Sequence, residues 1–380
     1  MYSRVCLLCI IVTLSLGYVA SKPGVEENDK IFSVPLEVIH PRDIDCEISK
    51  NVSRCEVELS NGNSANVQNF QGGLMSIMEI GIDKQTFKVQ LDTGSEILWV
   101  FGDNCSDENK KCSGHTKYKL DKKIKYKDFK IGYASGAVII SKVEDTVQLT
   151  KDIIIEKQLF GAASDTTMDF AWYDGVIGLN TNTKSGWPSV IYSMIYNKLI
   201  KEPVYSMNLI GGTTSKKGGE ITFGGHNDKL IKGGHGISVR MARGGKTITQ
   251  MTGLNVGKHV FCGKKRDECT VLIDSGASYI LGPADFADFM DKVLRAKRDN
   301  QVNCKSINKF PVIEIMFGKQ MMSLEPQLYT YMSKRKCYSL IYANPSKLSH
   351  WAFGLPFFHK YYTQFDFTDN REEMTFWEKP

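Results

Sequence analysis

Short runs of alternating apolar and polar residues dominate the chain. Clear examples are residues 137–149, 237–239 and 310–317, which are rich in β-branched side chains. Alternation with a period of two places successive side chains on opposite faces of a strand, and the 33 glycines supply turns between the runs. Helical periodicity is short and lies near residues 190–199 and 284–297. We therefore predict an all-β fold, mainly antiparallel, with few short helices.

The length of the chain predicts two lobes. At 380 residues it exceeds the size at which one hydrophobic core usually suffices. Glycine and charged residues cluster between Gly234 and Gly253, which favours a boundary there. We predict an N-terminal lobe over residues 61–240 and a C-terminal lobe over residues 241–380.

Two segments share a pattern in which apolar residues lead into an aspartate, a small hydroxyl residue and a glycine. They are residues 89–95 (Val-Gln-Leu-Asp-Thr-Gly-Ser) and 271–278 (Val-Leu-Ile-Asp-Ser-Gly-Ala-Ser). Each predicts a strand that delivers a carboxylate, Asp92 or Asp274, into a tight turn. Two carboxylates that are close enough to share a proton cannot both ionise, so one serves as an acid and the other as a base. The pattern indicates a site that activates water.

One such motif alone is more often a surface turn than a catalytic site. The pair is more specific, because both copies follow apolar runs and lie 182 residues apart, enough for one lobe each. Together they resemble the active-site loops of the pepsin-like aspartic proteases, whose two aspartates share one proton. The resemblance covers most of residues 61–380. It implies a bilobal fold with a central cleft, and an endopeptidase that cuts proteins or peptides without a metal or organic cofactor.

The resemblance also assigns roles to the residues that flank the catalytic aspartates. Ser95 and Ser278 would hydrogen-bond the outer carboxylate oxygens, while Thr93 and Ser275 would brace the two loops against each other. The glycine after each of these bracing residues lets backbone and substrate approach closely. The supporting residues are Thr93, Gly94, Ser95, Ser275, Gly276 and Ser278.

A second shared element follows each aspartate. Residues 174–179 (Asp-Gly-Val-Ile-Gly-Leu) and 351–355 (Trp-Ala-Phe-Gly-Leu) both place two apolar residues before a glycine. Alone, each predicts no more than a buried strand. In the family this element threads beside the aspartate loop of its own lobe, so its order after each aspartate supports duplicated halves.

Residues 130–137 (Lys-Ile-Gly-Tyr-Ala-Ser-Gly-Ala) predict a hairpin with small residues at its tip. The hairpin resembles the flap of the family. The resemblance implies that Tyr133, Ala134 and Ser135 close over the substrate, and that Trp99 donates its indole N–H to the Tyr133 hydroxyl. The alternative for Tyr133 is an ordinary half-buried strand tyrosine.

The sequence departs from the family at several positions. Ile97 stands where asparagine is common, Ala134 replaces a common flap glycine, and Ala277 replaces a common threonine. Residues 354–356 read Gly-Leu-Pro where the family usually continues Gly-Asp. Some family members with alanine at the position of Ala277 work nearer neutral pH, so a raised pH optimum is a hypothesis. The rival function is a catalytically weak or inactive protein of this fold that binds ligands in its cleft.

The first 60 residues differ from the rest. Residues 1–21 contain one arginine, an apolar stretch and a Val-Ala-Ser ending, which predict a secretory signal peptide. Residues 22–60 hold five Lys or Arg and nine Asp or Glu, a net charge of −4. We predict that they form a propeptide that masks the cleft as an intramolecular inhibitor, although propeptides of the family are usually basic. Residues 30–36 (Lys-Ile-Phe-Ser-Val-Pro-Leu) resemble the opening strand of such propeptides, which pairs in the sheet of the enzyme.

Eight cysteines follow the signal peptide, and they fall into close or bracketed pairs. A zinc site is disfavoured because the histidines do not lie at ligand spacing beside them, and secretion favours disulfide bonds. The last three pairs also resemble the disulfides of pepsin-like enzymes in placement. The pairs are Cys46–Cys55, Cys105–Cys112, Cys262–Cys269 and Cys304–Cys337. Asn51 and Asn104 begin N-glycosylation sequons.

The net charge of the chain gives little information about its binding partners. Residues 61–380 carry a net charge of +9, but Lys and Arg are scattered rather than gathered with aromatics in a nucleic-acid-binding module. No segment after the signal peptide offers about 18 uninterrupted apolar residues. We expect a monomer without nucleic-acid or membrane partners, made as a zymogen in the secretory pathway. Its destination would be the cell exterior or an acidic lysosome- or vacuole-like compartment.

Overall fold

The structure is a computed structural model. It describes residues 32–39, 44–49, 52–58, 64–68, 75–168, 173–181, 186–211, 217–242, 244–263, 269–345, 351–368 and 372–380. For the strands before residue 75 it describes the backbone alone. The predicted signal peptide and Asn51 lie outside these residues.

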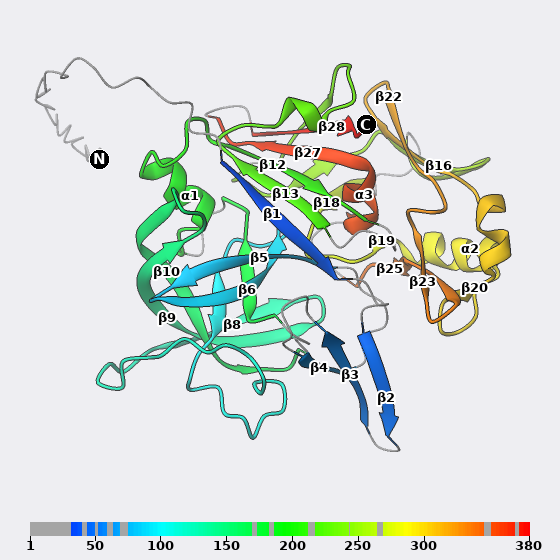
Figure 1. Ribbon diagram of the computed structural model, residues 1–380. Helices are drawn as coiled ribbons and strands as arrows, with labels where there is room; N and C mark the ends of the chain where they lie inside the picture. The colour runs from blue at the N-terminus through cyan, green and yellow to red at the C-terminus, as the bar shows by residue number, and fades with distance from the viewer. Residues whose placement is uncertain are drawn as a thin grey trace, which may run out of the picture.

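Within this part of the chain the predicted all-β class is confirmed (Figure 1). The strands are β1 (Phe32–Ile39), β2 (Ile44–Ser49), β3 (Val52–Glu58), β4 (Ser64–Gln68), β5 (Met75–Ile82), β6 (Gln85–Asp92), β7 (Trp99–Phe101), β8 (Asp128–Tyr133), β9 (Gly136–Gln148), β10 (Ile154–Thr166), β11 (Gly175–Gly178), β12 (Val204–Leu209), β13 (Lys217–Phe223), β14 (Ile237–Arg240), β15 (Ile248–Gln250), β16 (Gly253–Val256), β17 (His259–Cys262), β18 (Thr270–Ile273), β19 (Ile280–Gly282), β20 (Gln301–Val302), β21 (Ile313–Phe317), β22 (Gln320–Leu324), β23 (Thr330–Ser333), β24 (Lys336–Ser339), β25 (Ile341–Ala343), β26 (Trp351–Phe353), β27 (Tyr361–Asp366) and β28 (Glu373–Glu378).

The helices are few and short. The two predicted helices are confirmed as α1 (Val190–Tyr196) and α2 (Ala284–Leu294), and 3-10 turns lie at η2 (Asp228–Leu230) and η3 (Cys304–Lys309). A third helix, α3 (Leu355–Lys360), was not predicted. It begins directly after Gly354, where the sequence departs from the family. The sequence feature that favours this helix is Pro356, because proline in the first turn of a helix costs no helical hydrogen bond.

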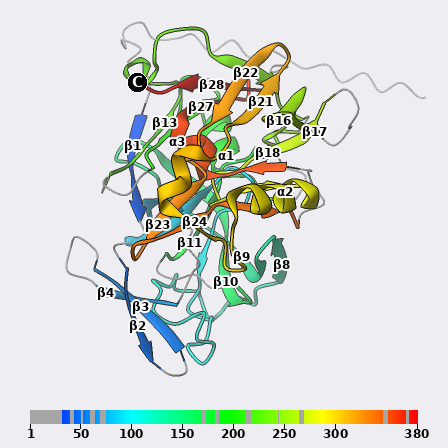
Figure 2. The same ribbon diagram turned by 90° about the vertical axis from the view of Figure 1, so that its right-hand side faces the viewer.

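The strands divide the molecule into two lobes joined by a shared sheet. Among the described residues, 13 strands form one sheet in the order β14-β28-β27-β12-β13-β1-β5-β6-β11-β7-β10-β9-β8. The β5 to β10 end of this sheet lies to the left in Figure 1, and the smaller sheets of the C-terminal half lie with α2 to the right. Figure 2 shows the C-terminal half from the right-hand side. This arrangement confirms the predicted bilobal, mainly antiparallel architecture.

Strand β1 is hydrogen-bonded on both sides. It pairs antiparallel with β13, where Val34 lies opposite Ile221, and with β5, where Val38 lies opposite Ser76. The strands β2, β3 and β4 form a separate three-stranded sheet, in which the backbones of Cys46 and Cys55 lie opposite each other. Because β3 pairs with β4, this sheet has strands on both sides of residue 60. The propeptide boundary and the Cys46–Cys55 disulfide stay predictions.

The second shared element threads beside the aspartate strand in both lobes. β11 runs parallel to β6, with Gly178 opposite Asp92, and β26 runs parallel to β18, with Phe353 opposite Ile273. The Gly178 N–H donates to the Ile97 carbonyl (3.2 Å), and the Gly354 N–H donates to the Tyr279 carbonyl (2.9 Å). Both acceptors stand five residues after their aspartate, so the two halves repeat one construction.

The glycine of this element is required by close packing. A Cβ at Gly178 would lie 2.4 Å from the Ile97 nitrogen, and one at Gly354 would lie 2.1 Å from the Ala277 oxygen. Both contacts are with backbone, which cannot move aside as a flexible side chain can. The aspartate loops are therefore fixed from behind by strands that tolerate no side chain at this point.

Three of the four predicted disulfide bonds are present. Cys105–Cys112 and Cys262–Cys269 each join cysteines that are seven positions apart, and Cys304–Cys337 joins cysteines that are 33 positions apart. Their Cα–Cα distances are 5.6, 5.3 and 5.3 Å, within the ordinary range for disulfides. The sequon residue Asn104 lies in an exposed turn beside the first of them.

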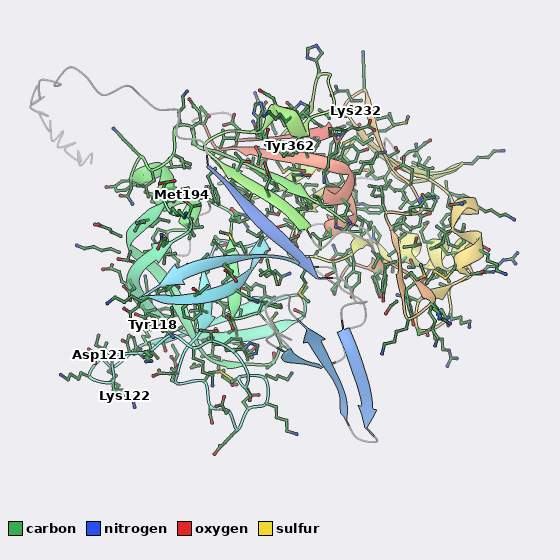
Figure 3. The ribbon with its side chains drawn as sticks, in the orientation of Figure 1. Tyr118, Asp121, Lys122, Met194, Lys232 and Tyr362 are labelled. Atoms are coloured by element: carbon green, nitrogen blue, oxygen red, sulfur yellow. A yellow bond between two sulfur atoms is a disulfide. The ribbon has the colours of Figure 1, made fainter. Side chains whose placement is uncertain are left out.

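The lysine-rich segment 119–130 leads from β7 to the flap strand β8. Asp121 and Lys122 project from this segment at the periphery, and Tyr118 lies at its beginning (Figure 3). The Tyr118 hydroxyl donates to Asp145 of β9 at 2.8 Å, which ties the segment to the lobe. No helix among the described residues is long and apolar enough to cross a bilayer.

We expect Gly354→Ala to lower the free energy of unfolding by about 3 kcal/mol, because the new methyl group would overlap the carbonyl oxygens of Ala277 and Tyr279. Gly233→Ala is the matched control, since nothing lies within 4 Å of a Cβ at that exposed glycine. Urea unfolding followed by circular dichroism measures both. Equal stability of the two variants would show that the close approach behind the second loop is absent.

Candidate active site

The two predicted aspartates meet at the junction of the lobes. Asp92 is the last residue of β6, and Asp274 follows the last residue of β18. A Cβ at Gly94 would lie 2.9 Å from the Asp274 carboxyl carbon, and one at Gly276 would lie 2.7 Å from Asp92 Oδ1. The glycine of each loop therefore lies against the carboxyl group of the other loop, and the two carboxyls are hydrogen-bonded to each other.

Reciprocal hydrogen bonds lock the two loops together. The Thr93 hydroxyl donates to the carbonyl of Ile273 (2.7 Å) and accepts from the Ser275 N–H (3.0 Å). The Ser275 hydroxyl donates to the carbonyl of Leu91 (2.8 Å) and accepts from the Thr93 N–H (3.1 Å). Thr93 and Ser275 are fully buried. Each hydroxyl is satisfied as donor and acceptor, so the two loops brace each other. Thr247 adds a bond from its hydroxyl to the Thr93 carbonyl (2.8 Å).

The two carboxyls differ in their hydrogen bonds. Each accepts the N–H of the glycine two residues later, Gly94 to Asp92 at 2.8 Å and Gly276 to Asp274 at 2.9 Å. Asp92 also accepts from the Ser95 hydroxyl. The equivalent position after Asp274 is Ala277, which has no hydroxyl. Donors to the ionised form therefore favour the charge on Asp92 more than on Asp274.

The pKa values of the two carboxyls depend on burial and on these hydrogen bonds. Burial raises the pKa of Asp92, but the bonds from Ser95 and Gly94 oppose the rise. Burial, together with the charge of Asp92, raises the pKa of Asp274 well above its ordinary value. Two carboxyls in contact hold one proton between them over a wide pH range. Both pKa values are raised, so the pair keeps a proton, and the bond from the Ser95 hydroxyl favours the negative charge on Asp92.

The strands β8 and β9 form an antiparallel hairpin at the position of the expected flap. β8 and β9 are joined by the exposed residues Ala134 and Ser135, and Tyr133 precedes them. The indole N–H of Trp99 donates to the Tyr133 hydroxyl at 2.8 Å. Trp99 is fully buried, so it holds the tyrosine at a fixed place near the dyad. Burial raises the pKa of Tyr133, and the nearby charge of Asp92 adds to the rise.

The flap is also fastened on its far side, by a residue that sequence reasoning missed. Thr167 donates its N–H to the Ala137 carbonyl, and its hydroxyl accepts from the Ala137 N–H; both bonds are 2.9 Å. A Cβ at Gly136 would lie 2.7 Å from the Thr167 hydroxyl and 2.7 Å from Met168. No local motif marks Thr167, because its partner stands 30 residues earlier in the chain.

A cleft of about 540 Å³ contains both aspartates and the flap. Apart from the dyad its wall is mainly apolar and aromatic. The residues that line it are Met75, Gln90, Asp92, Tyr133, Ala134, Ser135, Thr167, Met168, Tyr173, Val176, Asp274, Gly276, Ala277, Ser278, Tyr279, Leu281, Tyr342, Ala343 and Pro345. Ser278 is thus placed in the cleft wall beside the second aspartate.

The sequence could have placed two of these residues, Gln90 and Tyr279, in the cleft wall. Gln90 stands two residues before Asp92 in a strand and so faces the same side, and Tyr279 directly follows the second motif. Tyr342 had no such signal, because only the parallel pairing of β19 with β25 brings it beside Leu281. In the described part of the chain, no group of three or more His, Cys, Asp or Glu could hold a metal ion.

Comparison with known proteins agrees with this geometry. The model of the eukaryotic aspartyl protease family matches residues 74–375. A renin from Echis ocellatus is 29% identical over 312 residues, which cover 77% of this chain and 78% of the relative. Cathepsin D from Clupea harengus is also 29% identical, and pepsin B from Canis lupus familiaris is 25% identical, with the same coverage. The family match spans well over half of the sequence, and the chain therefore belongs to the eukaryotic aspartyl protease family.

Proposed function

We propose that the protein is an aspartic endopeptidase that hydrolyses peptide bonds with water activated between Asp92 and Asp274. The observation that carries the proposal is the pair of hydrogen-bonded carboxyls, one from each lobe, with unequal support from their loops. This is the arrangement that general acid–base catalysis requires, because one group is ready to accept a proton while the other is ready to donate one.

The hydrogen bond from Ser95 to Asp92 supports a division of roles between the two aspartates. Asp92, ionised and steadied by Ser95, takes a proton from the attacking water. Asp274 donates its proton to the carbonyl oxygen of the peptide as negative charge develops there. The proton that Asp92 has gained then passes to the departing amine. No group outside the chain is needed for these transfers.

An extended peptide fits the cleft as an added strand beneath the flap. Tyr133 and its bond to Trp99 set the height of the flap, and the largely apolar walls offer pockets for side chains. The departures Ala134 and Ile97 leave the Trp99–Tyr133 bond in place. This supports turnover rather than binding alone, since the dyad, its braces and its flap anchor are all present.

We expect Asp92→Asn to reduce cleavage of a denatured protein at least about a hundredfold across pH 3 to 7, because the general base is lost. Asp288→Asn, the same change on an exposed face of α2, should leave the rate unchanged. An inhibitor that mimics the tetrahedral intermediate should abolish the wild-type activity. A folded, processed wild-type chain that cuts nothing at any pH would favour the rival function, a ligand-binding protein of the same fold.

A pair of variants tests how the two aspartates divide their roles. Removing the donor in Ser95→Ala raises the pKa of Asp92, so the acidic limb of the kcat/KM profile should move to higher pH. Adding a donor in Ala277→Ser lowers the pKa of Asp274, so the basic limb should move to lower pH. Ser113→Ala, at an exposed position, is the control. Movement of the opposite limb by either variant would reverse the assignment.

We further propose that residues 22–60 are an inhibitory propeptide of a glycosylated, secreted or lysosome-like zymogen that works as a monomer. Support comes from the acidic charge of the segment against a basic body and from the position of β1 within the main sheet. The hydrogen bonds that brace the dyad and anchor the flap join residues of the body to one another.

We expect a chain that begins at Ser60 to cut at least several times faster than the full secreted chain. Because loss of β1 exposes the edges of β5 and β13, a second variant carries a cleavage site after Ser60, so the strand can stay in the sheet. Circular dichroism verifies folding. A folded chain of either kind that is no more active than the full chain would refute the inhibitory role.

A further inference from the structure

Gln90 is a polar side chain in an otherwise apolar part of the cleft. It lies on β6 two residues before Asp92, so both side chains face the cleft, about 7 Å apart along the strand. Its neighbours in the sheet are Ile77 of β5 and Val176 of β11, both buried. An aliphatic side chain would suit these surroundings without desolvating an amide. The carboxamide therefore needs hydrogen-bond partners to offset the cost of its desolvation.

One half of that carboxamide is used within the protein. Its Nε2 donates to the carbonyl of Gly276, in the second aspartate loop, at 3.0 Å. Because Gly276 offers an oxygen there, the nitrogen of Gln90 must face it, and Oε1 must face elsewhere. This bond crosses between the loops, 186 residues apart in sequence, and fixes the rotation of the amide.

The other half faces the cleft. Among the described residues, none donates a hydrogen bond to Oε1, and Oε1 is not sealed from solvent. The second N–H of Nε2 likewise has no described acceptor. Since Gly276 holds the amide in place, Gln90 presents a donor and an acceptor side by side to a bound ligand. Among the described residues that line the cleft, it is the one carboxamide.

We propose that Gln90 selects substrates that carry a carboxamide side chain, Asn or Gln, within two residues of the bond that is cut. This inference rests on the proposed endopeptidase function and names its substrate class. A primary amide matches the donor–acceptor edge of Gln90 with two hydrogen bonds. An aliphatic side chain of the same shape would leave that edge unpaired, and a site built around a hydrogen bond rejects such an analogue. A carboxylate would match the donor alone and would also face the charge of Asp92.

The distance between Gln90 and Asp92 limits which substrate residues Gln90 can contact. A peptide that lies extended in the cleft advances about 3.4 Å per residue, so the step of about 7 Å from Asp92 to Gln90 corresponds to two residues. The carboxamide preference should therefore fall at one of the four residues that flank the scissile bond. The remaining subsites should keep the apolar preference that Val176, Leu281 and Tyr342 indicate.

The test uses matched peptides in which each of these four positions in turn is Asn, Leu or Asp. Asn and Leu have nearly the same shape, so they differ in hydrogen bonding alone. We expect the wild type to prefer Asn over Leu at one position by roughly tenfold in kcat/KM. Gln90→Leu should remove or reverse this preference, and Gln90→Glu should weaken it. Gln320→Leu, the same change at an exposed position of β22, should retain it.

Binding of the same peptides to the Asp92→Asn variant separates this inference from the proposed function. If the wild type cuts nothing but Asp92→Asn still binds the Asn peptide more tightly than the Leu peptide, the endopeptidase proposal fails and the role of Gln90 stands. Equal cleavage and equal binding of Asn and Leu peptides at all four positions would overturn the role of Gln90. A preference that survives Gln90→Leu in a folded protein would also overturn it, because Gln90 would then only join the two loops.

Discussion

The exchange of hydrogen bonds between Thr93 and Ser275 is the constraint on which the rest of the site depends. Each hydroxyl donates to the carbonyl that precedes the aspartate of the other loop and accepts a backbone N–H from that loop. Both groups are fully buried, so neither has water as an alternative partner. Leaving such a group unpaired costs about 1–3 kcal/mol, and separating the loops would orphan all four bonds together. Two carboxyls that repel when ionised are thereby held in contact.

The shared construction of the two halves makes one chemical difference between their loops informative. Both loops use the same glycine N–H bond, the same hydroxyl brace and the same parallel strand behind them. They differ where Ser95 in the first loop corresponds to Ala277 in the second. A single hydroxyl thus breaks the chemical equivalence of a geometrically repeated pair. It favours the charge on Asp92, which supports the proposed roles of Asp92 as base and Asp274 as acid.

The cleft combines rigid and adaptable parts. Below the substrate position, strands β6, β11, β18 and β26 leave no room for a Cβ where Gly178 and Gly354 pass the loops. Above it, the flap is held at Tyr133 by Trp99 and at Ala137 by Thr167, while the tip residues Ala134 and Ser135 are exposed. The two aspartate loops are therefore fixed by packed backbone, and the flap beside the cleft is a short hairpin with small side chains at its tip.

The sequence by itself determined the fold class and the centre of the site. Alternation of apolar residues predicted strands, and the repeated Asp-Thr/Ser-Gly motif placed Asp92, Asp274, Thr93 and Ser275 in equivalent loops. These features are local, since strand periodicity and turn chemistry depend on a few consecutive residues. The flap and the last three disulfides were implied by the resemblance to the family, together with a hairpin pattern and the pairing of cysteines along the chain.

Only the tertiary structure decided which distant residues complete the cleft. Thr167 reaches the flap, Tyr342 reaches the wall through a parallel strand pair, and Gln90 reaches Gly276 across the two loops. It also placed α3 directly behind the second loop, where the sequence shows a departure and one proline. The raised pKa values of the two aspartates also depend on the tertiary structure. Their main cause is burial, which is set by packing between segments far apart in the chain and leaves no local pattern in the sequence.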